Sequence, residues 1–257
     1  MRRLVITEGL PCSGKSTSAK FIAEQLGWRF VDEGSGNNPA DWEFHAFVKE
    51  DELPEFSPEQ QKVITAGVKG CGGFVVPISG TEGEFFDRLL SRKIYDFLPW
   101  ETERPVMLEK WRSFAGNCTE PVVLDCVFLQ NPMCETMMRF GFPEQVSAEY
   151  IREIADIIRP LEPFVVYLKC SNIRSRIEAA LPERGEEWLN AVVDYHCGGG
   201  YGKPLGLSGF EGYISALEER QRRELRILGS LGMDCIVIED PEQNWDSSYQ
   251  EMIAALG

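Results

Sequence analysis

The stretch from Gly9 to Thr17, Gly-Leu-Pro-Cys-Ser-Gly-Lys-Ser-Thr, constrains the fold more than any other part of the chain. It fits the pattern G-x-x-x-x-G-K-[ST]. It follows a short apolar run, Leu4–Ile6, and precedes a segment whose apolar residues recur at near-helical spacing. Strand, glycine-containing loop and helix form the context in which this pattern holds a phosphate group. The sequence therefore predicts a phosphate-binding loop near the start of an α/β domain.

Each position of this loop has an expected role. Gly9 and Gly14 lack a β-carbon, so the backbone can wrap a phosphate and turn its N–H groups inward. The helix expected to begin near Lys15 points the positive end of its dipole at the same place. We expect Lys15 to reach the β- and γ-phosphates of ATP and the Ser16 hydroxyl to bind Mg²⁺. The other predicted nucleotide contacts come from Pro11, Cys12, Ser13 and Thr17.

Two acidic residues follow the second expected strand. The segment Trp28–Val31 has strand character, and Asp32 and Glu33 begin a turn that runs to Pro39. In an open α/β sheet, the carboxyl ends of the strands face the crevice where ligands bind. One of the two carboxylates is therefore a candidate to accept the proton of an acceptor hydroxyl, and the alternative is a solvated or capping residue in a turn.

A third acidic residue, Asp125, ends the apolar run Pro121–Leu124, which is typical of a buried strand. We expect its carboxylate to lie beside the Mg²⁺ with Ser16, where it holds the ion or activates the acceptor. Gln130 and Asn131 follow as candidates for polar substrate contacts. Arg139 is either a ligand for an acidic substrate group or a surface residue.

Residues 39–120 do not follow a regular strand–helix repeat. We interpret them as a mostly helical, substrate-binding insert within a single domain of residues 1–257. Gly67–Gly83 is glycine-rich and interrupted by a proline. The expected helical segments are Trp42–Val48, Glu84–Leu98 and Pro105–Phe114.

Three arginines follow the fourth expected strand, Phe164–Leu168, within a predicted lid at 171–210. Arg174, Arg176 and Arg184 are candidates to neutralise charge on a transferred phosphoryl group. The alternative is that they form surface ion pairs with neighbouring glutamates, which contribute little to stability.

The last part of the chain predicts a helix over Ser208–Leu231, a fifth strand at Cys235–Ile238 and a final helix over Asp246–Leu256. We expect the Glu- and Arg-rich side of the first of these helices to face solvent. The predicted fold is a three-layer α/β domain with a five-stranded parallel sheet.

Composition limits the partners. The net charge of −15 argues against a nucleic-acid polymer or an anionic membrane surface, and no apolar run approaches the roughly 20 residues of a membrane span. Eight cysteines without a C-x-x-C pair, and only two histidines, argue against a zinc site. With no export signal apparent, we expect a cytoplasmic location. The sequence does not indicate an oligomeric state.

The phosphate loop, the acidic residues and the lid arginines resemble the P-loop kinases, most closely the thymidylate-kinase and nucleoside-kinase-like group. That group has an acidic residue after the second strand, an Asp-containing element after the third and an arginine-bearing lid after the fourth. The resemblance implies the P-loop NTPase fold with sheet order 2-3-1-4-5. Two departures stand out. Asp125-Cys126-Val127 occupies the place of an Asp-Arg-Tyr or Glu-Arg-Ser triplet, and Cys12 stands where many such kinases have glycine.

The resulting hypothesis is an ATP-dependent phosphotransferase that moves the γ-phosphate to a hydroxyl or phosphate of a small molecule, nucleoside-like or otherwise. Two alternatives are an NTP-hydrolysing regulatory switch and a nucleotide-binding module without turnover. The sequence leaves open the identity of the acceptor and which of Asp32, Glu33 and Asp125 is the base.

Overall fold

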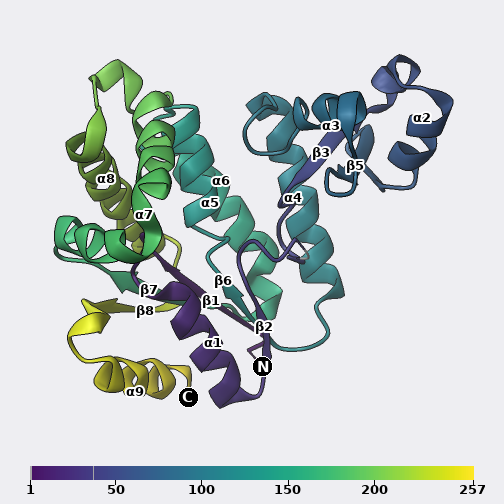
Figure 1. Cartoon of the computed structure of the whole chain (residues 1–257). Coiled ribbons are helices and arrows are strands. Elements are labelled where there is room, and N and C mark those ends of the chain that lie inside the picture. Colours follow the sequence, from purple (N-terminus) through teal and green to yellow (C-terminus); the bar gives the residue numbers. More distant parts are fainter. Residues whose placement is uncertain (1, 37) are drawn as a thin grey trace. The chain divides into compact units, whose positions relative to one another are not determined.

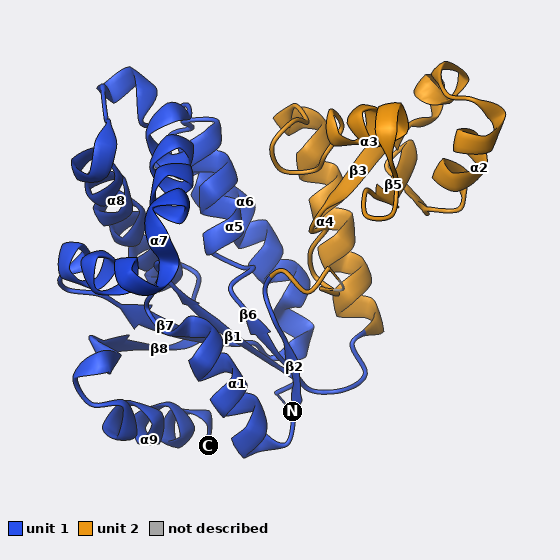
Figure 2. Ribbon diagram, viewed as in Figure 1, with its two compact units in different colours: residues 1–33, 118–257 blue, residues 34–117 orange. Residues whose placement is uncertain are grey.

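The computed structural model of the protein describes residues 2–36 and 38–257. The chain divides into two compact units (Figure 2). Unit 1 comprises residues 1–33 and 118–257, and unit 2 comprises residues 34–117. The turn expected from Asp32 to Pro39 includes Asn37, which lies outside the described residues.

Unit 1 is built on a parallel sheet of five strands in the order β2-β6-β1-β7-β8. Counted along the chain within this sheet alone, the strands lie in the order second, third, first, fourth, fifth. The labels depart from the expected 2-3-1-4-5 because three unpredicted strands of unit 2 intervene. The bounds are β1 Leu4–Gly9, β2 Arg29–Val31, β6 Val122–Asp125, β7 Phe164–Lys169 and β8 Asp234–Glu239.

Helices cover both faces of this sheet, which gives three layers (Figure 1). On one face, α1 (Lys15–Leu26) and α9 (Trp245–Leu256) pack on Phe164, Val166 and Leu168 of β7. Because side chains alternate along a strand, Tyr167 points to the other face, towards α8. The remaining elements of unit 1 are α5 Gln130–Met133, the π-helix η2 Cys134–Arg139, α6 Glu144–Ile158, η3 Arg159–Leu161, α7 Ile173–Gly198, η4 Lys203–Leu205, α8 Gly209–Ser230 and η5 Pro241–Gln243.

The predicted lid region, 171–210, is mostly helical. Helix α7 bends at Gly185, whose φ of 81° and ψ of 169° are not helical. The glycine-rich turn after α7 is held by backbone bonds to η2: the Gly200 N–H donates to the Arg139 carbonyl at 2.8 Å, and the Tyr201 N–H donates to the Met138 carbonyl at 3.3 Å. The segment is therefore a bent helix with an anchored end.

Unit 2 contains a three-stranded antiparallel sheet, β3-β5-β4, where a mostly helical insert was expected. Strand β3 is His45–Lys49, β4 is Val68–Gly70 and β5 is Gly73–Pro77. The prediction of a helix over Trp42–Val48 is wrong, because Ala46 and Val48 alternate onto a core shared with Phe74 and Val76 of β5. The predicted glycine-rich segment forms the β4–β5 hairpin, whose turn residues Cys71 and Gly72 both have positive φ, as tight hairpins require.

The helices of unit 2 are η1 Glu50–Glu55, α2 Pro58–Thr65, α3 Gly83–Leu90 and α4 Trp100–Asn117. Helix α3 is shorter than predicted because the chain then runs beside β3, where the Ile94 N–H donates to the His45 carbonyl at 2.8 Å. Helix α4 is longer than predicted at both ends.

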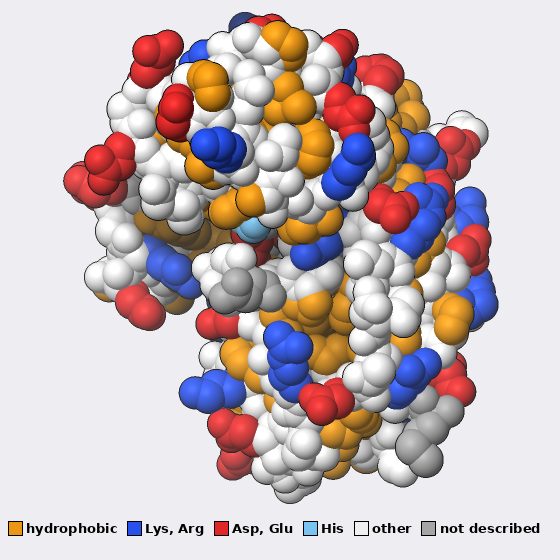
Figure 3. Space-filling view, turned by 90° about the vertical axis from the view of Figure 1, so that its right-hand side faces the viewer, with side chains coloured by type: hydrophobic (Ala, Val, Ile, Leu, Met, Phe, Trp, Pro, Cys, Tyr) orange, Lys and Arg blue, Asp and Glu red, His pale blue; other side chains and the backbone are white. Residues whose placement is uncertain are grey.

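No helix of residues 2–36 and 38–257 is both long and apolar enough to cross a bilayer. Figure 3 shows basic and acidic side chains interspersed over one face of the molecule. The net charge of −15 of the whole chain is therefore compatible with a mixed distribution of charges on that face.

Candidate functional site

The phosphate loop joins the end of β1 to the start of α1 in a conformation that requires glycine at two places. A β-carbon on Gly9, whose φ is 146°, would lie 2.6 Å from the Leu168 carbonyl oxygen. A β-carbon on Gly14, whose φ is 90°, would lie 2.4 Å from the Trp245 ring. Both positions are therefore closed to larger residues by close neighbours as well as by backbone conformation.

Cys12 also has a positive φ, 65°, which costs a non-glycine residue about 1 kcal/mol or more. This accounts physically for the glycine that many related loops carry at the same place. The Cys12 carbonyl accepts a hydrogen bond from Nε of Arg176 at 2.7 Å. Burial raises the pKa of the Cys12 thiol, against the opposing effect of Arg184 and Lys15.

A cavity of about 670 Å³ within unit 1 opens onto this loop. Gly9 and Ser13 are not among the residues that line it, although they shape the loop. Its lining residues come from the loop, the end of β2, α5, η2, α7 and α8: Pro11, Cys12, Gly14, Lys15, Ser16, Thr17, Glu33, Gln130, Cys134, Arg176, Ala179, Ala180, Glu183, Arg184, Trp188, Val192, His196 and Arg220.

Lys15 and Asp125 place opposite charges beside the phosphate loop, residues 9–17, whose part of the cavity is here called the loop end. The Lys15 side chain is buried, and its Nζ donates to the Leu10 carbonyl at 3.0 Å. Asp125 is fully buried; its Oδ1 accepts a 3.4 Å bond from the Thr7 hydroxyl, and its Oδ2 has no hydrogen-bond partner among the described residues. Burial raises the Asp125 pKa, while the Ser16 hydroxyl and Lys15 oppose that rise. A buried carboxylate oxygen without a partner is costly, so Oδ2 is suited to bind a cation.

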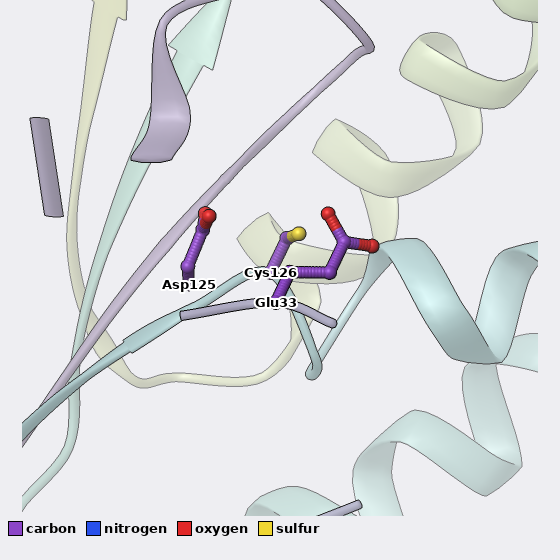
Figure 4. Close-up of side chains that lie close together, drawn as sticks. All are labelled: Glu33, Asp125 and Cys126. Atoms are coloured by element: carbon purple, nitrogen blue, oxygen red, sulfur yellow. The ribbon is translucent and has the colours of Figure 1, made fainter. Parts of the chain in front are cut away.

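Glu33, Asp125 and Cys126 offer ligand atoms that all lie within 4.8 Å of one another, and their side chains project to the same side of the backbone (Figure 4). Nε2 of Gln130 donates to Oε1 of Glu33 at 2.6 Å and contacts the Cys126 sulfur at 3.3 Å. Glu33 lines the cavity, whereas Asp32 does not. Of the two candidate carboxylates in this turn, only Glu33 can therefore contact a ligand in the cavity.

Two of the three predicted lid arginines line the cavity. Arg176 does so while bonded to the phosphate loop, and Arg184 does so with its guanidinium 5.7 Å from the Trp188 ring centroid. Arg174 is not part of the lining, and it forms ion pairs with Glu211 and Glu178 instead. Its geometry is that of the surface-pair alternative.

Arg139 is likewise absent from the lining. Its guanidinium pairs with the buried carboxylate of Glu135 one helical turn away, at 2.6 Å.

Arg220 is a cavity residue that the sequence did not identify, because the charged side of α8 was expected to face solvent. Its side chain is only 1% exposed, and Nε donates to Glu224 at 2.6 Å. The other oxygen of Glu224 accepts from the Tyr167 hydroxyl at 2.6 Å. The spacing Tyr213, Leu217, Arg220, Glu224 puts the two charges in phase with the apolar stripe of the helix, a signal that was available in the sequence.

His196, on α7, is the second unpredicted cavity residue. Its Nδ1 lies 2.7 Å from the Val192 carbonyl, so Nδ1 carries the proton and Nε2 is the hydrogen-bond acceptor. Nε2 is buried and has no partner among the described residues. Burial, with a smaller contribution from Arg220, lowers the His196 pKa to about 4, which keeps the ring neutral at pH 7.

Glu8 supports the site from beneath. Its fully buried carboxylate accepts N–H bonds from Phe128, Leu129 and Gln130 at 2.7, 2.9 and 3.1 Å. Burial raises its pKa to about 7 in spite of these donors, and Glu224 adds to the rise. The three bonds fix the segment that presents Gln130 to the cavity. The signal for this role in the sequence is a lone acidic residue, Glu8, inside the apolar first strand.

Comparison with known proteins finds no matching family model and no similar curated sequence. Among solved structures, the chain is similar to the YorR protein from Bacillus subtilis in complex with phosphorylated GDP, with 16% identity, a TM-score of 0.48 and coverage of 98% of this chain and 95% of that one. It is also similar to a deoxyadenosine kinase from M. mycoides with bound dATP (14%, 0.44, 98% and 98%) and to a sugar kinase from Janibacter sp. (14%, 0.43, 100% and 95%). The five-stranded parallel sheet of unit 1, its strand order and the phosphate loop between β1 and α1 are those of a P-loop NTPase fold.

Proposed function

We propose that this protein is an ATP-dependent phosphotransferase that moves the γ-phosphate of ATP to a hydroxyl or phosphate of a small molecule. The observation that carries the proposal is one cavity whose lining joins the phosphate loop to the Glu33 carboxylate and to Arg176 and Arg184. Its volume, about 670 Å³, lies in the range of small-molecule sites.

At the loop end, the backbone N–H groups and Lys15 bind the phosphates, and Nζ exchanges the Leu10 carbonyl for a phosphate oxygen. Ser16 and Asp125 are oxygen donors of the kind that Mg²⁺ prefers, and the free Oδ2 of Asp125 fits that role. The bound ion would neutralise charge on the phosphates.

At the acceptor, Glu33 is the favoured base among the three carboxylates. It lines the cavity, and Gln130 holds one of its oxygens, leaving the other for an acceptor hydroxyl. Arg176 and Arg184 stabilise charge that develops on the transferred group. Residues 171–210, which supply Arg176 and Arg184, are the proposed lid. None of the described residues of 39–120 lines this cavity, so their role as a substrate-binding insert stays a prediction.

The test is phosphate transfer from [γ-³²P]ATP to a broad metabolite panel, with ADP release measured in parallel. We expect at least one acceptor to be labelled, and Lys15→Ala to reduce kcat/KM by about 10³-fold, since it removes the phosphate-binding cation. Lys20→Ala, an exposed lysine on α1, is the matched control and should retain activity. Rapid ADP release that no acceptor stimulates, with no labelled product, would overturn the proposal.

A further inference from the structure

Four residues of the cavity, Gln130, Cys134, His196 and Arg220, come from elements other than the phosphate loop and are here called the inner wall. Except for the contact of Gln130 with Glu33, the phosphate-transfer chemistry proposed above does not use them. They are buried or half-buried, and their polar groups point to a ligand of definite chemistry.

His196 supplies a hydrogen-bond acceptor. The Val192 carbonyl takes the proton-bearing Nδ1, so the lone pair of Nε2 is left without a donor in a buried position. An acceptor left unsatisfied in this way costs free energy unless a ligand or water donates to it. The side chain is 4% exposed and lines the cavity, so a bound ligand can satisfy it.

Arg220 supplies hydrogen-bond donors. Nε is used by Glu224, and the two terminal nitrogens make long contacts, 3.5 Å to the Cys134 sulfur and 3.4 Å to Oε1 of Gln130. A guanidinium has five N–H donors, so capacity remains for a ligand oxygen. Donors and a neutral acceptor thus lie in one wall.

The charges at the wall disfavour an anionic ligand there. Glu224 already balances Arg220 at 2.6 Å. The other cations among the described lining residues are Lys15, Arg176 and Arg184. They lie at the loop end, where Lys15 bonds to Leu10, Arg176 bonds to Cys12 and Arg184 opposes the rise that burial causes in the pKa of the Cys12 thiol. A phosphorylated group at the wall would instead meet the His196 lone pair and, through Gln130, the Glu33 carboxylate.

We propose, resting on the phosphotransferase function above, that the inner wall binds the acceptor and that this acceptor is an uncharged, hydroxyl-bearing molecule. Arg220 donates to one of its oxygens, and one of its O–H or N–H groups donates to Nε2 of His196. A second hydroxyl oxygen of the acceptor attacks the γ-phosphorus as the bond from that phosphorus to the bridging oxygen of ADP breaks. The hydroxyl proton passes to Glu33, and ADP leaves. His196 and Arg220 are therefore specificity-determining residues.

The first test compares matched pairs of acceptors with ATP and Mg²⁺: thymidine and its 5′-monophosphate, adenosine and its 5′-monophosphate, glucose and glucose 6-phosphate, glycerol and glycerol 3-phosphate. In any pair of which at least one member accepts phosphate from ATP, we expect the uncharged member to have at least tenfold higher kcat/KM than the phosphorylated member. Preference for the phosphorylated members would overturn the inference and leave the phosphotransferase function standing. Transfer to no member of this panel or of the broader one would overturn both.

The second test uses two variants of one residue, with the best uncharged acceptor as probe. His196→Asn keeps a donor for Val192 but loses the acceptor at the Nε2 position, whereas His196→Gln can place its amide oxygen there. We expect the asparagine variant to raise the acceptor KM about tenfold with the KM for ATP unchanged, and the glutamine variant to recover much of that loss. Thermal melts of both variants establish that they fold. An acceptor KM that is unchanged in folded His196→Asn, or a rise of equal size in both KM values, contradicts the role assigned to His196.

Discussion

The two ends of the cavity in unit 1 are built in different ways. The loop end comes largely from nine consecutive residues, 9–17, and its shape is set by backbone conformation at Gly9 and Gly14. The inner wall is assembled from α5, η2, α7 and α8, and its polar groups are fixed by a buried ion pair, Arg220–Glu224. Local sequence can encode the first kind of site, whereas the second exists only when distant helices pack together.

The difference extends to how each end tolerates change. A buried ion pair leaves an uncompensated charge when one partner is removed, which costs about 3–5 kcal/mol. Truncation of Arg220 would therefore report on stability as much as on binding, and His196 is the cleaner probe of the wall. At the loop end, Ser16 is exposed and the Lys15 side chain makes a single hydrogen bond, to the Leu10 carbonyl. Variants of these two residues should therefore fold and report on function.

The largest expected effect concerns Glu33, where the two ends meet. Glu33→Gln removes the proposed base while keeping an oxygen for Gln130, and we expect kcat to fall by about 10² to 10⁴ with little change in the KM for ATP. Asp32→Asn is the matched control, since Asp32 does not line the cavity, and it should stay within about threefold of wild type. Steady-state kinetics with a labelled acceptor measure both. A larger loss of kcat in Asp32→Asn than in Glu33→Gln would show that Asp32, and not Glu33, is the base.

A second prediction concerns Glu8, which supports the segment between the two ends. Its folded pKa of about 7 lies above the ordinary 4.5, so the folded state keeps a proton that the unfolded chain releases. The resulting stabilisation is present below pH 4.5 and is lost as pH rises through about 7, an effect of about 3 kcal/mol. Urea unfolding across this window should show the decline in wild type and not in Glu8→Gln.

Glu24→Gln, an exposed carboxylate on α1, serves as the control and should follow the wild-type pH dependence. The informative quantity is the difference in free energy of unfolding between wild type and Glu8→Gln. Taken as the wild-type value minus the Glu8→Gln value, this difference should be highest near pH 4.5 and fall by about 3 kcal/mol by pH 8. A difference that stays constant with pH would mean that Glu8 is ionised in the folded protein throughout.

The comparison also shows what the sequence could predict. The five strands of unit 1 and its helices α1, α8 and α9 follow from buried apolar runs and helical periodicity, and the phosphate loop follows from a contiguous motif. Helix α7 was predicted only as a lid segment. Asp125 and Glu33 were candidates because strand ends of a parallel sheet meet at one edge. Arg220 was missed because the charged side of α8 was assigned to solvent, although its spacing from Tyr213 and Leu217 places it on the apolar stripe. His196 was missed because no local pattern distinguishes a buried histidine in a helix from a solvated one.

The strands of unit 2 were missed for a different reason. Its strands are short, and β3 lies where aromatic residues also fit a helical pattern. The sheet is stabilised by pairing between residues almost 30 positions apart, such as Phe47 with Val75, which no local pattern reveals. The local signal for the β4–β5 hairpin was the Cys71-Gly72 turn. It is weak, because the first turn residue is not one of the residues that usually adopt a positive φ.

The smallest expected effect is a difference in kcat/KM between variants of Arg176 and Arg174, two arginines of the predicted lid. Arg176 lines the cavity and reaches the loop through the Cys12 carbonyl, so Arg176→Ala should lower kcat/KM by about tenfold or more through lost contact with phosphate charge. Arg174 lies outside the lining and pairs with exposed carboxylates, so Arg174→Ala should change kcat/KM by less than about twofold and stability by about 0–1 kcal/mol. The two substitutions remove the same group from the same helix two residues apart, so a difference between them reports the different contacts of the two guanidinium groups, with the phosphate loop for Arg176 and with exposed carboxylates for Arg174. If both lowered kcat/KM equally, the helix would have to turn Arg174 towards the nucleotide on binding, and the loop end would then be as dependent on distant packing as the inner wall is.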